Sequence, residues 1–501
     1  MVSSTKVSKS TKSTKLNMSD EGLAFDDVLL IPQFSKILPS DVDLTTKLTN
    51  KINLKIPIVS AAMDTVTESK MAITLAGEGG IGIIHKNMNI DEQAQQIKMV
   101  KKYESGVIKD PITASPSMSV KEIYDITKKY GISGVPIVDK NILVGIVTNR
   151  DLRFVDNLNL SVTKIMTPKE RLITVKENYT KEEVISALRE NRIEKILIVN
   201  KKHELRGMIT FKDIQKSTTY PNASKDKSGS LIVGGAIGTN KESMERAEAL
   251  INQKADVIVI DTAHGHSKLV LDMLKRIKKK FPQQQVIAGN IATEQAAKDL
   301  ISCGADAVKV GIGPGSICTT RIVAGVGVPQ LSAVMNVAKI SKKMKVPLIA
   351  DGGIRYSGDI AKAIAAGADT VMLGGLLAGT DESPGDVELY EGRTYKSYRG
   401  MGSIGAMQKG SRDRYLQDNE KATSKLIPEG IEGRVPYKGT MKTILHQLTG
   451  GLKSSMGYVG CDNLENMKKN TRFIKISSSA KQESHVHDVA IVKEPPNYQP
   501  R

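Results

Sequence analysis

Eight short apolar segments, each followed by a stretch with helical spacing, limit more than any other feature what this chain can fold into. The segments are rich in Val, Ile and Ala without polar alternation, which is typical of strands buried on both faces of a parallel sheet. They occupy residues 57–64, 80–86, 231–238, 255–265, 285–292, 305–313, 346–353 and 368–375. The stretches between them carry apolar residues three and four positions apart, as helices do when they cover a sheet. Eight strands that alternate with helices predict an α/β fold, a (β/α)₈ TIM barrel, rather than an open sheet.

The regular spacing of these segments is interrupted once, between His85 and Leu231, which indicates an inserted domain. Residues 111–216 of the insertion contain an internal repeat. Each half carries Ile-Val before a turn, then Gly-Ile-Val-Thr or Gly-Met-Ile-Thr, then an Asp that opens a helix (Asp151 and Asp213). A repeated unit of this kind buries its apolar face by packing against its copy.

The repeat resembles a tandem pair of cystathionine-β-synthase (CBS) motifs, known together as a Bateman domain. The resemblance implies binding of adenine or guanine nucleotides such as ATP or GTP, and a structural spacer without a ligand is the alternative. We expect the CBS domain to span residues 110–220 and the barrel to comprise residues 21–109 and 221–501. Residues 1–20 are rich in Lys, Ser and Thr, so we expect a disordered basic tail there.

Composition narrows the classes of partner. The net charge of +18 would attract nucleic acid or phosphorylated small molecules. With no Trp and only 4% aromatic residues there is little material for stacking on bases, so nucleic-acid binding is disfavoured. No segment reaches the roughly 18 apolar residues that cross a bilayer, so no membrane role is expected. Three scattered cysteines (Cys303, Cys318 and Cys461) form neither a disulfide framework nor a zinc site, which favours a reducing, cytoplasmic location.

Glycine pairs follow the last two predicted strands. In barrels of this kind the chemistry lies at the carboxyl ends of the strands, and a phosphate site often forms after strands seven and eight. Asp351-Gly352-Gly353 ends the seventh strand and Gly374-Gly375 ends the eighth. Bare backbone N–H groups can approach an anion at such positions. Close helix packing would explain either pair alone, but two pairs at consecutive strand ends favour a phosphate ligand.

A Gly-rich loop with a thiol follows the sixth strand, at residues 311–321 (GIGPGSICTTR). A lone Cys is more often an inert buried residue. Here the neighbours are polar or Gly, and Arg321 would favour the thiolate, the nucleophilic form. We therefore predict that Cys318 is a nucleophile. His264 and His266 have no third ligand nearby, so the sequence does not predict a metal centre there.

This loop, the glycine pairs and the insertion together resemble the inosine-5′-monophosphate (IMP) dehydrogenase and GMP reductase family, with bacterial-type motifs, over about residues 22–498. Other matching segments are GLAFDDVLLIP (22–32), SAAMDTVTE (60–68), GIIHKNM (82–88), YRGMGS (398–403), RDRYLQD (412–418) and KLIPEGIEGRVPYKG (425–439). The resemblance to the dehydrogenases implies oxidation of IMP to xanthosine 5′-monophosphate (XMP) with NAD, the rate-controlling step of guanine nucleotide synthesis within purine biosynthesis.

The resemblance also implies roles for single residues. Cys318 would attack C2 of the hypoxanthine ring and form a covalent thioimidate that water later hydrolyses. The residues expected to bind IMP are Ser316, Asp351, Gly353, Gly374, Gly375, Tyr398, Gly400, Met401, Gly402 and Glu429. The residues expected to bind NAD are Asp261, Asn290, Gly311 and Gly313.

Hydrolysis would require a mobile flap, which we place at about residues 380–440. This segment is long, rich in Gly and charge, and fits no helix–strand repeat, as is typical of a lid. Arg414 and Tyr415 match the family's catalytic pair, and Thr320 would help to activate water. Because a guanidinium keeps its proton far above neutral pH, two interpretations stay open. Arg414 is a general base with a depressed pKa, or it is an electrostatic clamp and Thr320 carries the proton.

The family also binds potassium through backbone oxygens, and the resemblance implies such a site here. Gly313, Gly315 and Cys318 match the loop ligands. Ligands from the carboxyl-terminal segment of a neighbouring subunit correspond to Glu483, Ser484 and His485. The resemblance implies a homotetramer, or an octamer built from two tetramers.

Two alternative functions were weighed against this prediction. GMP reductase shares the barrel and the thiol loop but normally lacks the inserted domain and the Arg-Tyr flap, both of which this chain carries. A catalytically silent protein that senses nucleotides and assembles is the other alternative. The joint presence of Cys318, Thr320, Arg414, Tyr415 and Glu429 argues against it.

Overall fold

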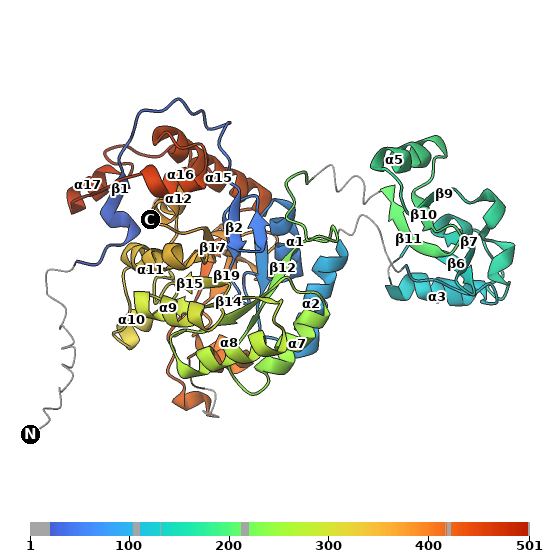
Figure 1. The fold of residues 1–501 in the computed structure, drawn as a ribbon, viewed down its shortest axis with the longest axis horizontal. Coiled ribbons are helices and arrows are strands. Elements are labelled where there is room, and N and C mark those ends of the chain that lie inside the picture. Colours follow the sequence, from blue (N-terminus) through green and yellow to red (C-terminus); the bar gives the residue numbers. More distant parts are fainter. Residues whose placement is uncertain are drawn as a thin grey trace, which may run out of the picture.

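A closed barrel of eight parallel strands forms the centre of the molecule (Figure 1). The computed structural model describes residues 21–103, 111–130, 132–211, 220–415, 417 and 422–498. Around the barrel the strand order is β12-β13-β14-β15-β16-β17-β4-β5. Their bounds are β4 Ile58–Ser60, β5 Ile81–Ile84, β12 Val233–Ile237, β13 Val257–Asp261, β14 Gln285–Ile291, β15 Ala307–Val310, β16 Leu348–Asp351 and β17 Thr370–Leu373. Each predicted apolar segment supplies one strand, so the predicted TIM barrel is confirmed.

The barrel strands are buried on both faces, which is why they lack polar alternation. In β13, Val257 and Val259 belong to an apolar cluster inside the barrel, whereas Ile258 and Ile260 belong to the cluster that the strands share with the surrounding helices. Alternate residues of one strand therefore fill two different cores, and both sets must be apolar.

Helices cover the outside of the barrel (Figure 1). They are α1 Ser69–Gly77, α2 Ile90–Tyr103, α7 Ser243–Asn252, α8 Lys268–Lys280, α9 Glu294–Ser302, α11 Gln330–Met344, α12 Ser357–Ala365 and α15 Met441–Tyr458. In α8, Ser267 caps the first turn by accepting from the Val270 backbone N–H. Val270, Met273, Leu274 and Ile277 form its buried face at helical spacing.

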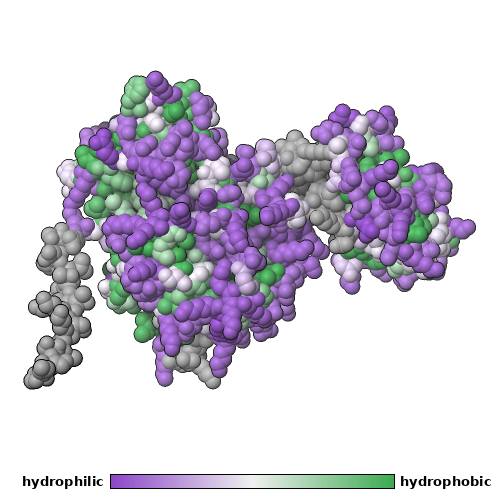
Figure 2. All heavy atoms as spheres, viewed as in Figure 1, coloured by the Kyte–Doolittle hydropathy of each residue, from purple (hydrophilic) through white to green (hydrophobic). Residues whose placement is uncertain are grey.

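Shorter elements extend the barrel at its ends. The hairpin β2 Thr46–Thr49 and β3 Ile52–Leu54 packs Leu48 and Leu54 onto the interior cluster. Further short elements of the barrel domain are the helical turn Phe25–Asp27, β1 Val28–Leu30 paired with β21 Phe473–Lys475, and the helices α10 Thr320–Val323, α13 Gly375–Ala378, α16 Leu464–Asn470 and α17 Ser478–Glu483. Hydrophilic residues dominate the face seen in Figure 2. Within the described residues, no helix is both long enough and apolar enough to cross a membrane.

The insertion consists of two similar halves, as the repeat predicts. The first half has α3 Val120–Tyr130, β6 Gly134–Asp139, β7 Ile142–Thr148, α4 Asn149–Leu152 and β8 Thr167–Pro168. The second has β9 Thr174–Lys176, α5 Lys181–Glu190, β10 Lys195–Val199 and β11 Leu205–Thr210. Each half forms a three-stranded sheet, and the two share an apolar cluster that includes Leu143 and Leu197. Asp151 opens α4 by accepting from the Thr148 N–H, whereas Asp213 and the predicted basic tail (1–20) lie outside the described residues.

The predicted flap contains more regular structure than the sequence indicated. Three antiparallel strands form a small sheet in the order β18-β19-β20: β18 Val387–Tyr390, β19 Arg393–Arg399 and β20 Glu432–Pro436. Between β19 and β20 lie α14 Ile404–Ala406 and short helical turns at Met407–Ser411, Arg412–Tyr415 and Thr423–Lys425. All residues of β18 and most of β20 are exposed, so these two strands lack the pattern of burial that reveals a strand in a sequence.

Candidate active site

A cavity of about 850 Å³ lies at the carboxyl ends of the barrel strands. Nearly all the residues predicted to bind substrate or cofactor, or to act in catalysis, line it. They are Asp261, Asn290, Gly311, Gly313, Gly315, Ser316, Cys318, Thr320, Asp351, Gly353, Gly374, Gly375, Tyr398, Gly400, Met401, Arg414, Tyr415 and Glu429. Gly402 lies just behind the wall, where a Cβ would come within 2.7 Å of the Tyr415 ring. The sequence therefore predicted the walls of one cavity from segments far apart in the chain.

Cys318 lies in the loop after β15 and is partly exposed to the cavity. Its Sγ is 3.2 Å from the Oγ1 of Thr320, the first residue of α10. The loop pairs with the returning part of the flap, because the Thr319 N–H donates to the Glu429 carbonyl at 3.0 Å and Cys318 forms a bridge with Gly430. The thiol, the hydroxyl and the flap thus meet at one place.

Arg321, predicted to favour the thiolate, is engaged with the loop itself. Its Nε donates to the Ile312 carbonyl at 3.1 Å and its Nη2 to the Val328 carbonyl at 2.6 Å. Burial lowers the pKa of Arg321, and the nearby Cys318 thiol opposes that shift. Its clearest role in the structure is to brace the two sides of the loop.

One end of the cavity is built from glycine turns and a buried tyrosine. Gly352 and Gly353 have φ values of +90° and +78°, which favour glycine. A Cβ on Gly375 would lie 3.4 Å from the Tyr398 ring and 3.6 Å from the Ser316 Oγ. Burial raises the pKa of Tyr398 despite a hydrogen bond with Ser316. The predicted phosphate residues therefore come together around one pole of the cavity.

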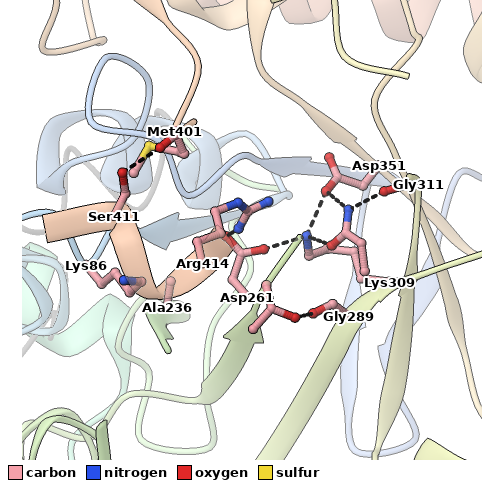
Figure 3. A network of polar contacts seen from close by, with 12 residues as sticks. Lys86, Ala236, Asp261, Gly289, Lys309, Gly311, Asp351, Met401, Ser411 and Arg414 are labelled. Atoms are coloured by element: carbon pink, nitrogen blue, oxygen red, sulfur yellow. Dashed lines mark hydrogen bonds and ion pairs between the residues drawn. The ribbon is translucent and has the colours of Figure 1, made fainter. Parts of the chain in front are cut away.

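A chain of charged side chains also lines the cavity (Figure 3). Asp351 accepts from the Asn290 amide at 2.9 Å and from the Lys309 ammonium at 2.7 Å. The same ammonium donates to Asp261 at 2.9 Å. Lys309 was not among the predicted site residues, although a single cation within the apolar strand Ala307–Val310 is a signal visible in the sequence.

Arg414 of the flap forms an ion pair with the other oxygen of Asp261. Burial alone would lower the pKa of Arg414, but the charge of Asp261 and the contact with Tyr415 raise it above its ordinary value. Burial raises the pKa of Tyr415 to about 12. In this arrangement both side chains keep their protons, so neither is poised as a base.

Buried polar contacts hold the flap against the barrel. Lys86, just after β5, forms an ion pair with Asp413, and both side chains are less than one-tenth exposed. The Asn87 amide donates to the Ala406 carbonyl at 3.2 Å. These partners lie in segments that resemble the family, but nothing in the sequence indicates that they pair.

The two predicted halves of the potassium site do not meet within one chain. Gly313, Gly315 and Cys318 share the thiol loop, where the Gly315 carbonyl accepts from the Cys318 N–H at 3.1 Å. Glu483, Ser484 and His485 lie at and after the end of α17 and do not line the cavity. Among the described residues, no cluster of three or more His, Cys, Asp or Glu could hold a metal ion.

The strand ends bring a thiol, glycine turns and two carboxylates to one cavity, and this arrangement is typical of a barrel enzyme. The comparison with known families gives the particular class. The family model described as "IMP dehydrogenase / GMP reductase domain" matches residues 22–487, and the chain belongs to that family.

Curated relatives match almost the whole chain. Proteins named inosine-5′-monophosphate dehydrogenase are 54% identical in Pasteurella multocida and 55% in Escherichia coli K12, in each case over 96% of this chain and 99% of the relative. The protein of the same name from Aquifex aeolicus is 57% identical over 95% of this chain and 98% of its own.

A solved GMP reductase from Trypanosoma brucei, in complex with guanosine 5′-monophosphate, matches with a TM-score of 0.86 and 41% identity. The match covers 94% of this chain and 99% of that one. The unmatched 6% is far shorter than the insertion, so a reductase with a counterpart of the inserted domain exists. The insertion alone therefore does not separate a dehydrogenase from a reductase in this family.

Proposed function

We propose that this protein is an IMP dehydrogenase, which oxidises IMP to XMP with NAD and so feeds guanine nucleotide synthesis. The observation that carries the proposal is the 54–57% identity to dehydrogenases along nearly the whole chain, against 41% to the solved reductase. The enclosed thiol, hydroxyl and flap arginine support it, because a dehydrogenase must add water to the purine and a reductase need not.

Cys318 acts as the nucleophile. Its sulfur bonds to C2 of the purine, and the hydrogen on C2 leaves as hydride. NAD, when bound, accepts that hydride. Water then adds to C2 of the thioimidate and the C2–S bond breaks, which releases XMP and restores the thiol. Covalent catalysis of this kind divides one difficult reaction into two easier ones.

IMP lies between the glycine pole and the flap in this proposal. Ser316, Gly353, Gly374, Gly375 and Tyr398 hold the phosphate, and the carboxylate of Asp351 suits the ribose hydroxyls beside it. The purine is held by Gly400, Met401, Gly402 and Glu429. In this proposal these residues stay in place, and only the part of the flap between Gly402 and Glu429, which carries Arg414, opens and closes.

NAD binds along the opposite wall, at Asp261, Asn290, Gly311 and Gly313. The Asp261 carboxylate has the right chemistry for a ribose hydroxyl, and the cavity is open to it. Arg414 occupies this carboxylate when the flap is closed. The ribose of NAD and the flap arginine therefore compete for Asp261, which separates hydride transfer from hydrolysis.

Of the two interpretations of Arg414, the structure favours the clamp. Its raised pKa makes loss of a proton more difficult than in water. Thr320, whose hydroxyl contacts the Cys318 sulfur, carries the proton from water in this proposal. Arg414 then stabilises developing negative charge on the attacking oxygen.

Three further properties belong to the proposal. A potassium ion binds the carbonyls of Gly313, Gly315 and Cys318 together with residues 483–485 of a neighbouring subunit, in a cytoplasmic homotetramer or octamer. The inserted domain, residues 110–220, is a CBS domain that binds ATP or GTP. Exchange of potassium for lithium should slow turnover, and a nucleotide-dependent rise in melting temperature would separate a sensor from a spacer.

The decisive test is incubation of the purified protein with IMP, NAD and potassium, followed by NADH absorbance. We expect NADH to accumulate, and Cys318→Ala to produce none. Consumption of NADPH in the presence of GMP, with no signal from IMP, would identify a reductase. Absence of turnover in both assays, with nucleotide binding retained, would favour the silent sensor.

A further inference from the structure

Lys309 is a buried cation for which the proposed chemistry has no role. Its side chain is only 1% exposed, and Ala307, Val308 and Val310 beside it in β15 are buried and apolar. An ammonium group in such surroundings is strongly destabilising unless carboxylates pair with it. An apolar residue would suit this barrel wall better, so the charge needs an explanation other than packing.

The ammonium contacts three side chains from three different strands (Figure 3). It donates to Asp261 of β13, to the side-chain oxygen of Asn290 in β14, and to Asp351 of β16. A Cβ on Gly289 would lie 2.8 Å from the Lys309 Cβ, so β14 passes directly against the lysine stem. The stem is fixed by the barrel, and its charged end is fixed by the two carboxylates.

We infer that Lys309 is a positioning residue that holds Asp261 and Asp351 at a fixed spacing, so that one side chain organises both ribose sites. The inference rests on the proposed function, because the two carboxylates serve ribose hydroxyls only if IMP and NAD bind as described. Lys309 belongs to the barrel, whereas Arg414, the other cation on Asp261, belongs to the flap. When the flap opens and Arg414 moves away, Lys309 therefore remains paired with Asp261.

Loss of the ammonium should affect binding more than chemistry. In Lys309→Met, Asp261 and Asp351 would repel each other and lose a shared hydrogen-bond donor, so both would turn away from the sugars. We expect KM for IMP and for NAD each to rise about 10- to 100-fold, the range for loss of a charge-assisted hydrogen bond. The value of kcat should change less, because Cys318 and Thr320 pair with each other.

Lys309→Arg keeps the charge and should recover most of the affinity for both substrates. Lys396→Met is the matched control, because Lys396 is also buried but, among the residues that the structure describes, donates to the backbone carbonyls of Thr380 and Ser383 alone, at 2.9 and 2.7 Å. A purely structural role for a buried lysine predicts that both methionine variants lose stability and keep their KM values.

The experiment measures KM for each substrate, IMP binding by calorimetry without NAD, and thermal unfolding, for the full chain and the three variants. KM values of Lys309→Met within twofold of the wild type would overturn the inference, as would equal impairment of the Arg and Met variants. If Lys309→Met does not fold, the inference is tested with Lys309→Arg instead. KM values of Lys309→Arg less than about fivefold above the wild type support the inference, and larger increases in KM overturn it. A wild-type protein without IMP turnover would instead refute the proposed function.

Discussion

The buried ion pair between Lys86 and Asp413 should control how long the flap stays closed. Asp413→Asn removes the charge but keeps an acceptor, and we take the loss as about 1.5 kcal/mol, at the low end for hydrogen bonds to charged groups. Asp413→Ala removes the acceptor as well, for a loss of about 3 kcal/mol. These losses reduce the closed-to-open ratio of the flap about 10-fold and about 100-fold. Position 238 accommodates only glycine beside this ion pair, because a Cβ on Gly238 would overlap the Asp413 carboxylate.

Rapid-mixing measurements of NADH separate the two halves of the reaction. In the proposed mechanism hydride transfer takes place with the flap open, so the initial burst should survive in both Asp413 variants. The steady phase depends on closure and should slow by the two factors above. Lys409→Met, an exposed change on the same part of the flap, is the control and should leave both phases unchanged. A burst that shrinks in parallel with the steady phase, or a steady phase that Asp413→Ala does not slow, would refute the reasoning.

Three further predictions concern the flap arginine, the phosphate turn and the acid limit of stability. Arg414→Ala should keep the NADH burst and slow the later phase on the order of 100-fold, as loss of a group that assists water addition does; a lost burst contradicts this. Gly353→Ala should raise KM for IMP about 10-fold, because its φ of +78° costs roughly 1–2 kcal/mol for a residue with a Cβ; an unchanged KM would place the phosphate elsewhere. Burial opposes ionisation of Asp64, but hydrogen bonds from Arg399 and Asn87 outweigh it and lower the pKa of Asp64. The Asp64 carboxylate therefore contributes its full stabilisation above about pH 4, and this stabilisation is lost as the pH falls through the folded-state pKa. The urea midpoint of Asp64→Asn should consequently fall less on acidification than that of the wild type.

The barrel could be predicted because its strands satisfy two apolar cores at once. A segment such as Val257–Asp261 has no polar residue before its carboxyl end, and that pattern needs only local sequence to be recognised. Part of the cavity wall followed from the same logic, because Asp351 ends one strand and Gly375 follows another, whereas Asp261 was assigned through the family resemblance. The barrel topology then places these residues together at the carboxyl-terminal end of the barrel.

Partnerships between distant charges could not be predicted. Lys309 donates to Asp261, 48 positions earlier in the chain, and Lys86 pairs with Asp413 across 327 positions. No spacing rule relates such residues, because the barrel and the flap decide which of them meet. The flap sheet was missed for a related reason: its strands are stabilised by pairing with each other, and most of their side chains remain exposed.

The inserted domain joins the chain between α2 and β12, which is where a helix returns to begin the next strand. In a (β/α)₈ barrel such a junction lies at the amino-terminal ends of the strands, whereas the Cys318 thiol lies at the carboxyl-terminal ends. The inserted domain could therefore be replaced or lost in evolution without moving the residues of the active site. An allosteric effect of the inserted domain must therefore be transmitted along the barrel or through a neighbouring subunit. It can change the rate only by shifting a conformational equilibrium that involves both the inserted domain and the active site.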